Sequence, residues 1–197
     1  MENKNIKEQI INIINESVSV KNSISSDPIF LKAIDLSVDI ITDAFKKGNK
    51  LLFCGNGGSA ADAQHLAAEF TGRFYIDRKA LPAEALHCNT SYVTAVGNDY
   101  GYEFIYSRIV EGIAKPGDVL IGLSTSGRSK NIVNAMRKAR EKDVFAIGFT
   151  GSSGGDIKTH SNILFNVPSN NTPRIQEAHL LIGHIICELV EKNIFKK

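Results

Sequence analysis

The stretch DVLIGLSTSGRS, residues 118–129, joins an apolar run to a loop of hydroxyl side chains, and a helical pattern follows it over residues 130–141. A short continuous apolar run is typical of a strand that is buried on both faces, as the strands of a parallel sheet are. The stretch therefore predicts a strand over 118–123 and a helix over 129–141, which is the repeating unit of a parallel α/β sheet.

The same alternation of apolar run, Gly/Ser-rich loop and helical pattern continues along the chain from residue 50. Residues 77–112 are harder to interpret, although a strand over 83–86 and a helix over 103–112 fit their pattern. We expect an α/β three-layer sandwich with a central parallel sheet, of the flavodoxin-like or Rossmann-like kind, over residues 50–197. The clearest strands are predicted over 50–54, 118–123, 144–149 and 162–167, and helices over 59–74, 129–141 and 174–195.

Residues 1–49 precede this unit as an N-terminal helical extension. Two helices are predicted there, because apolar side chains recur at three- and four-residue steps: Ile6, Ile10, Ile13 and Ile14, then Ile34, Val38, Ile41 and Phe45. Pro28 suits the first turn of the second helix and Gly48 its end. No repeat or linker interrupts the sequence, so residues 1–197 are predicted to form one domain. The two helices would cover a sheet edge or contact another subunit, and we favour a symmetric helical interface.

The composition limits the partners that we expect. The 197 residues carry 23 Lys and Arg against 21 Asp and Glu without a long basic run, so neither nucleic acid nor a membrane is an expected partner. The first residues lack the apolar core of a signal peptide, and no apolar run approaches the roughly 18 residues of a membrane helix, which predicts a cytoplasmic protein. Cys54, Cys88 and Cys187 are odd in number and far apart, and we expect them to be reduced core residues.

The loop that contains Ser124, Thr125, Ser126 and Ser129 is a candidate phosphate site. It would lie between a strand and the start of a helix, where backbone N–H groups lack intrahelical partners and the helix dipole is positive. Gly127 allows the backbone to approach a ligand closely. The alternative is that Ser129 only caps the helix and the other hydroxyls decorate a turn. Four hydroxyl groups in six residues favour phosphate binding.

A second loop ends the first predicted strand, and its sequence Gly-Asn-Gly-Gly-Ser-Ala, residues 55–60, matches the dinucleotide fingerprint G-x-G-x-x-A. The match is weak, because Asp77 has the approximate distance of the required acidic residue but ends no apolar run. Neither loop has the spacing of a Walker A motif. We interpret residues 55–59 as a second ligand loop that faces the first across the sheet.

Ionisable side chains lie on the predicted helices that follow. His65 and Glu69 are four residues apart and share one helix face near the glycine loop. Gln176 and His184 are eight residues apart on the last helix, so both can face one cavity. His184 interrupts an apolar run, where an imidazole needs a partner. A hydrogen-bonded core histidine is the alternative to a functional one, and the second helix with His65 and Glu69 makes the two interpretations competitive.

Six motifs follow one another over nearly the whole chain: CGNGGS at 54–59, HLAAE at 65–69, TGR at 71–73, VGND at 96–99, STSG with Ser129 at 124–129, and RIQEAH with His184 at 174–184. Together they resemble the bacterial phosphoheptose isomerases, a family of sugar isomerase (SIS) domain proteins. The resemblance implies conversion of sedoheptulose 7-phosphate into D-glycero-D-manno-heptose 7-phosphate, an early step toward the heptose of lipopolysaccharide or capsule. It also implies a cytoplasmic homotetramer with active sites at subunit boundaries.

The resemblance also implies a role for each matching residue. Moving a carbonyl from C2 to C1 needs a base, an acid and an enediol. By resemblance Glu69 is the base and His184 the acid or second base; we expect burial to raise the pKa of Glu69, whereas His184 needs no large shift. Ser124, Thr125, Ser126 and Ser129 would hold the phosphate. Further substrate contacts are implied for Asn56, Gly57, Gly58, Ser59, Arg73, Asn98, Asp99 and Gln176, of which Arg73 and Asp99 could act indirectly or across subunits.

Some relatives bind zinc through residues that match His65, Glu69, Gln176 and His184, which implies Zn²⁺ as a cofactor. Zinc accepts imidazole and carboxylate donors, whereas an amide oxygen is an uncommon fourth ligand. A glutamate and a histidine that bind a metal cannot act freely as base and acid. Zinc would therefore polarise the substrate oxygens itself or be displaced as substrate enters, and the sequence leaves both roles open.

Two other functions on the same fold are the alternatives. A protein-binding relative that associates with the bacterial replication initiator shares the glycine loop and the Arg-Ile-Gln segment, but it lacks counterparts of Glu69 and His184. A binding protein has no need for that pair, which favours the isomerase. A sugar-phosphate sensor would bind substrate without turnover. Pro173 is a departure, because some relatives carry an aspartate at or near this position; it puts one substrate contact in doubt but fits a first helical turn.

Overall fold

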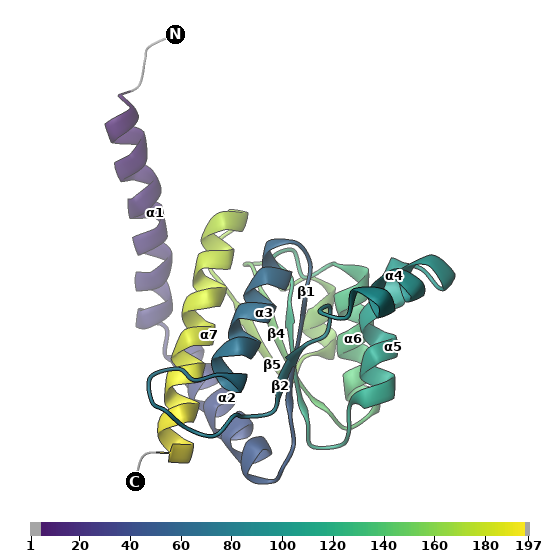
Figure 1. Ribbon diagram of the computed structural model, residues 1–197. Coiled ribbons are helices and arrows are strands. Elements are labelled where there is room, and N and C mark those ends of the chain that lie inside the picture. Colours follow the sequence, from purple (N-terminus) through teal and green to yellow (C-terminus); the bar gives the residue numbers. More distant parts are fainter. Residues whose placement is uncertain (1–4, 196–197) are drawn as a thin grey trace.

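The computed structural model describes residues 5–195, and a parallel sheet of five strands forms its centre (Figure 1). The sheet order is β2-β1-β3-β4-β5, which is the flavodoxin-like order and reverses direction between β1 and β3. Each predicted strand is confirmed to within one or two residues. The strands are β1 (Leu51–Gly55), β2 (Ala83–Ala85), β3 (Val119–Leu123), β4 (Phe145–Thr150) and β5 (Ile163–Asn166), all paired in parallel.

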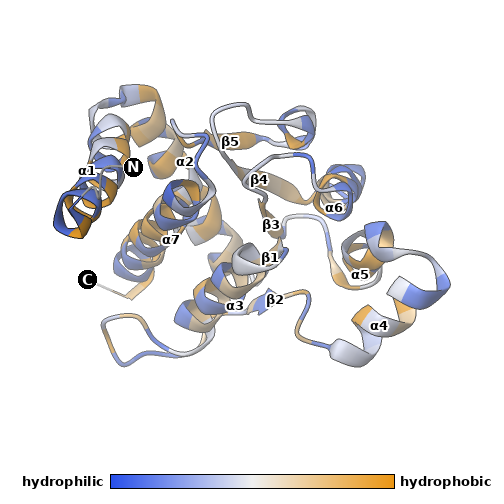
Figure 2. Ribbon diagram, turned by 90° about the horizontal axis from the view of Figure 1, so that it is seen from above, coloured by the Kyte–Doolittle hydropathy of each residue, from blue (hydrophilic) through white to orange (hydrophobic). Residues whose placement is uncertain are grey.

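Helices cover both faces of the sheet, so the predicted three-layer α/β sandwich is confirmed (Figures 1 and 2). Successive strand residues point to opposite faces, and Leu52 and Phe53 of β1 accordingly enter two separate cores. One face carries α2 (Pro28–Lys46), α3 (Gly58–Thr71) and α7 (Thr172–Phe195), and the other carries α4 (Thr90–Asp99), α5 (Ile105–Ile113) and α6 (Lys130–Glu141).

The helix α4 was missed by the sequence analysis, because it falls in the stretch 77–112 that gave no clear pattern. Only Val96 of this helix is buried, so the helix has no apolar stripe that periodicity could reveal. Its start does carry a signal, since the side chain of Asn89 accepts a hydrogen bond from the N–H of Tyr92. The predicted helix over 103–112 is present as α5, preceded by a short 3₁₀ turn, Tyr102–Phe104.

The two N-terminal helices differ in burial. The side chain of Asp27 caps α2, whose first residue is Pro28, and apolar side chains of α2 such as Ile34 and Ile41 are buried in the same core as α7. Figure 1 shows α1 (Ile6–Ser26) extending away from the body of the molecule. Its side chains Ile6, Ile10, Ile13 and Ile14 are 52–73% exposed. Helix α2 is therefore part of the core, whereas α1 presents an apolar face to its surroundings.

Two expectations from the composition can be compared with the structure. Cys54 and Cys187 are buried, but Cys88 is exposed, so the predicted core position is wrong for Cys88. The reason is local: Cys88 lies in the turn between β2 and α4, next to the residue that caps α4, rather than in a strand. Within residues 5–195, no helix is both long and apolar enough to cross a membrane.

Candidate active site

The two predicted ligand loops lie side by side at the carboxyl edge of the sheet. Strand β1 leads into residues 55–59 and α3, β3 leads into residues 124–129 and α6, and β1 pairs directly with β3. The sheet order reverses between these strands, and open α/β sheets bind ligands in the crevice at that point. The side chains of Asn56 and Asn131 join the loops, because each amide donates a hydrogen bond of 2.8 Å to the Oδ1 of the other.

The hydroxyl groups of the second loop surround the start of α6. Ser124 is buried and donates a hydrogen bond of 3.1 Å to Oγ of Ser129, while Oγ of Ser126 accepts one of 3.2 Å from the N–H of Arg128. Ser129 occupies the N-cap position of α6, yet within the described part of the chain its side chain makes no capping hydrogen bond. The interpretation of Ser129 as only a helix cap is therefore not supported.

Close approaches of the backbone explain two glycines of these loops. Gly127 has a φ of 65°, and a Cβ at this position would lie 2.3 Å from the carbonyl oxygen of Gly154, so only glycine fits. At Gly58 a Cβ would lie 2.6 Å from Nε2 of Gln176. The absence of a side chain there lets Gln176 reach the start of α3, where it donates a weak hydrogen bond of 3.5 Å to Ser59.

The volume of the cavities does not by itself identify the site. A cavity of about 490 Å³ lies at the amino edge of the sheet, where Asp43, Lys47 and Asn49 help to line it. Two smaller cavities, of about 330 and 270 Å³, flank the hydroxyl loop and reach Thr125 and Ser129 respectively. We place the phosphate and sugar subsites at the carboxyl edge, because both ligand loops lie there and α/β sheets bind ligands at that edge.

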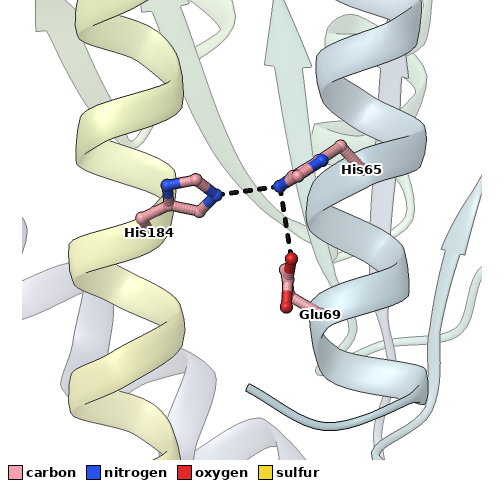
Figure 3. A group of neighbouring side chains, drawn as sticks. All are labelled: His65, Glu69 and His184. Atoms are coloured by element: carbon pink, nitrogen blue, oxygen red, sulfur yellow. Dashed lines mark hydrogen bonds and ion pairs between the residues drawn. The ribbon is translucent and has the colours of Figure 1, made fainter. Parts of the chain in front are cut away.

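Three ionisable side chains converge between α3 and α7 (Figure 3). Nε2 of His65 lies 2.9 Å from Nε2 of His184 and 3.2 Å from Oε1 of Glu69. His65 and Glu69 are one turn apart on α3, and His184 projects from the facing side of α7. The structure thus brings together the ionisable residues that the sequence analysis placed on two separate helices.

The surroundings of His184 favour its neutral form. Burial lowers the pKa of His184, and the neighbouring His65 lowers it further, whereas the charge of Glu69 acts in the opposite direction. His184 is therefore neutral at pH 7 and able to accept a proton. Because the two rings meet through their Nε2 atoms, one ring donates this hydrogen bond and the other accepts it.

The same cluster fits a metal ion. One donor atom each from His65, Glu69 and His184 lies within 4.8 Å of the other two. Two imidazole nitrogens and one carboxylate oxygen form the donor set of catalytic zinc sites that keep a fourth position open. Three of the four predicted zinc ligands therefore lie together. The fourth, Gln176, has its amide against Ser59 at the start of α3.

Known proteins share both the sequence and the fold. The model of the SIS domain family matches residues 30–151. A phosphoheptose isomerase from Clostridium acetobutylicum is 52% identical over 92% of this chain and 93% of its own length, and one from Burkholderia pseudomallei is 48% identical over 100% of both. This chain belongs to the phosphoheptose isomerase family. A solved isomerase of the family, GmhA from Neisseria gonorrhoeae, has a TM-score of 0.89 and 38% identity, covering 95% of this chain and 100% of that one.

Three predicted substrate residues of this isomerase are exposed and lie outside the cluster of histidines. Arg73 is in the loop after α3, and Asn98 and Asp99 are at the end of α4, where the Asn98 amide donates a hydrogen bond of 2.8 Å to Asp99. Figure 2 shows α4 on the other side of the sheet from α3 and α7. A single chain does not bring Asn98 and Asp99 to His65, Glu69 and His184.

Two residues at the site of the isomerase were missed by the sequence analysis. Asn131 is only 3% exposed, although it is polar, and it pairs with Asn56. The hydroxyl of Tyr102 donates a hydrogen bond of 3.1 Å to Oδ1 of the same Asn56. An asparagine in the first turn after a ligand loop was a signal for Asn131. Tyr102 comes from the stretch 77–112 and carried no such signal.

Proposed function

We propose that the protein interconverts sedoheptulose 7-phosphate and D-glycero-D-manno-heptose 7-phosphate through an enediol, as an early step toward the heptose of lipopolysaccharide or capsule. The observations that carry the proposal are the convergence of Glu69 and His184, from α3 and α7, and the presence in the same chain of a hydroxyl loop at the start of α6. An isomerase of sugar phosphates needs a site for an anion and an acid/base pair. Membership of the phosphoheptose isomerase family supports the identity of the sugar.

In this proposal Glu69 takes a proton from C1 of the ketose, and a proton is returned to C2 to form the aldose. His184 gives a proton to the oxygen on C2 and takes one from the oxygen on C1, which carries the substrate through the enediol. His65 orients His184 through the hydrogen bond of 2.9 Å between the rings. A positioned acid or base contributes typically about 10²–10⁴-fold to the rate.

The two ligand loops would bind different parts of the substrate. Ser124, Thr125, Ser126 and Ser129, together with the start of α6, would hold the phosphate, because hydroxyl and backbone N–H donors at a helix start suit an anion. Asn56 and Ser59, with Gly57 and Gly58 between them, would contact the sugar chain, and Gln176 lies against this loop. The reciprocal pair of amide hydrogen bonds between Asn56 and Asn131 would fix the distance between phosphate and sugar subsites.

Zinc is part of the proposal. His65, Glu69 and His184 would hold the ion, with Gln176 as the fourth ligand. Because Glu69 and His184 cannot act freely as base and acid while they hold the ion, Zn²⁺ would either polarise the oxygens of the substrate itself or be displaced as substrate enters. The donor atoms of His65, Glu69 and His184, which lie within 4.8 Å of one another, support three of these four ligands.

We also propose a cytoplasmic homotetramer with active sites at subunit boundaries. The exposed apolar face of α1, with Ile6, Ile10, Ile13 and Ile14, supports a helical interface between subunits. Arg73, Asn98 and Asp99 would reach the substrate of a neighbouring subunit, since their own chain holds Asn98 and Asp99 on the other side of the sheet. Light scattering at micromolar concentration should give the mass of a tetramer, and a stable monomer would contradict this part.

A turnover assay tests the proposed reaction. Purified protein is incubated with sedoheptulose 7-phosphate, and formation of the aldose is followed for wild type and for the Glu69→Gln variant. We expect turnover by wild type and a large loss in the variant. Wild type that is no faster than Glu69→Gln would contradict the proposal, and tight binding of substrate by such a protein would identify a sensor instead.

A further inference from the structure

A buried ion pair joins α3 and α7 on the far side of Glu69 from the ligand loops. Glu191 of α7 is 3% exposed, and its carboxylate accepts four hydrogen bonds. Oε1 accepts from the N–H of Phe74 over 3.1 Å and from Nε of Arg78 over 2.8 Å, and Oε2 accepts from the N–H groups of Tyr75 and Ile76 over 2.8 and 3.3 Å. Three consecutive backbone donors and one guanidinium thus hold this carboxylate.

The remaining donors of Arg78 bind the end of α3. Nη2 donates to the carbonyl oxygen of Glu69 over 2.8 Å, and Nη1 donates to those of Phe70 and Gly72 over 2.8 and 3.2 Å. The last carbonyls of a helix have no partner within the helix. Arg78, whose side chain is only 2% exposed, supplies that partner for the helix that carries His65 and Glu69.

Glu191 and the loop that it binds both lie close to His184. Glu191 lies seven residues, or about two turns, after His184, so both side chains project from similar faces of α7. Phe74, whose N–H binds Glu191, packs its ring against the ring of His184 with centroids 5.7 Å apart. The pair therefore ties the end of α3, the loop over 72–78 and α7 to one another beside His184.

We propose that Arg78 and Glu191 are positioning residues for the isomerase site, which set the separation of α3 and α7 and hold Phe74 against His184. The proposal rests on the proposed function for the roles of Glu69 and His184. Neither residue touches substrate. The side chains of His65 and His184 meet at 2.9 Å across the gap between the two helices, so a small change in helix separation alters this contact directly. Misplacement by about 1 Å can cost a catalytic site about 10²-fold.

The chain offers a matched control at the amino edge of the sheet. Asp118 is also buried and also accepts four hydrogen bonds: from the N–H and Nζ of Lys50 over 3.0 and 2.5 Å, from the N–H of Lys115 over 2.8 Å and from Nδ2 of Asn49 over 3.3 Å. In both carboxylates, each of the two oxygens accepts two hydrogen bonds. An amide nitrogen in place of either oxygen therefore faces two donors, whichever way the amide is turned. Glu191→Gln and Asp118→Asn remove comparable interactions, one beside the site and one remote from it.

The experiment compares wild type, Glu191→Gln, Arg78→Lys and Asp118→Asn by kcat, KM and melting temperature. The affinity of each metal-depleted protein for Zn²⁺ is measured in competition with a chromogenic chelator. We expect Glu191→Gln to lower kcat about 10–100-fold with KM within about threefold, because the hydroxyl loop stays in place, and to weaken Zn²⁺ binding about tenfold. Asp118→Asn should lower the melting temperature by a similar amount and leave kcat and Zn²⁺ affinity unchanged.

Two results would overturn the proposal. One is a Glu191→Gln protein with both kcat and Zn²⁺ affinity within about twofold of wild type; the other is an Asp118→Asn protein that loses as much of both. If Glu191→Gln does not fold, Arg78→Lys decides in the same way, since lysine keeps the charge but cannot reach the three carbonyls of α3 together. A wild type that turns over no sedoheptulose 7-phosphate contradicts the proposed function alone, and the Zn²⁺ affinities then decide on the positioning role.

Discussion

The two edges of the sheet use polar side chains in opposite ways. At the amino edge, Asp118 is 1% exposed and each of its carboxylate oxygens accepts two hydrogen bonds. At the carboxyl edge, the described residues include three buried polar atoms without a hydrogen-bond partner, namely Oδ2 of Asp62, Nδ1 of His87 and Nδ1 of His179, while a fourth, Oγ1 of Thr42, lies on α2. Buried polar groups are nearly always paired, so three unpaired atoms beside the ligand loops favour a ligand at that edge. The buried carboxylate of the amino edge is fully paired and stabilises the fold, whereas the carboxyl edge leaves polar atoms free for a ligand.

Glu69→Gln gives the largest effect that this comparison predicts. We expect kcat to fall about 10²–10⁴-fold, which corresponds to about 3–5 kcal/mol in the activation barrier. The stability of the fold should stay within about 0.5 kcal/mol, because the side chain is 24% exposed and its ion pair with His65 is at the surface. Aldose formation and urea denaturation measure the two quantities. A variant that loses stability but keeps kcat would assign Glu69 to the structure rather than to the chemistry.

Asp118→Ala should show the reverse behaviour. Removal of the carboxylate leaves the buried N–H groups of Lys50 and Lys115 without their acceptor, and we expect a loss of about 3 kcal/mol in the free energy of unfolding. The kcat of the folded fraction should equal that of wild type. Urea denaturation and the turnover assay, carried out at a temperature where the variant is folded, check both statements. A drop in kcat would show that the two edges are coupled.

Local sequence carries the strand–loop–helix units and both ligand loops. Buried parallel strands require continuous apolar runs, and the residues after β1 and β3 must lie at the carboxyl edge, so the approximate place of Ser124 and Asn56 follows from the order of elements. Helical spacing placed His65 with Glu69 on one helix face and His184 with Gln176 on another. The contact of 2.9 Å between His65 and His184 was not predictable, because it depends on how α3 and α7 pack.

Contacts between residues far apart in the sequence have no local signature. Glu191 binds Arg78, 113 residues earlier, and neither residue lies in a pattern that distinguishes it from a solvated charge. Burial of the two side chains is decided by the loop over 72–78, which folds back onto α7. The apolar pattern of α1 and α2 was recognised in both helices, but periodicity does not state which helix is buried within its own chain. That difference also comes from packing.

Stability at acid pH depends on His179, a buried histidine at the carboxyl edge. Burial lowers the pKa of His179 from 6.5 to about 4, although its hydrogen bond to the carbonyl oxygen of Thr150 acts the other way. Between these values the unfolded chain binds the proton and the folded one does not, so the contribution of His179 to stability is fully present above pH 6.5 and is lost as the pH is lowered toward 4. His179→Gln should remove about 2 kcal/mol of this loss. Urea denaturation at several pH values measures it, and an unchanged slope would rule out His179 as its source.

Ser129→Ala should give the smallest effect. It distinguishes whether the Ser129 hydroxyl binds phosphate or caps α6. If the hydroxyl binds phosphate, KM rises about 3–10-fold, kcat stays near wild type and stability changes by less than about 0.5 kcal/mol, because Ser129 makes no capping hydrogen bond within the described residues. If Ser129 is only a cap, stability falls by about 1 kcal/mol and KM is unchanged. Asp27→Ala is the control, since Asp27 accepts hydrogen bonds from the N–H groups of Ile29 and Phe30 and is a true cap. It should lose about 1 kcal/mol with no change in KM, and a Ser129→Ala protein that behaves in the same way would remove the hydroxyl from the phosphate site.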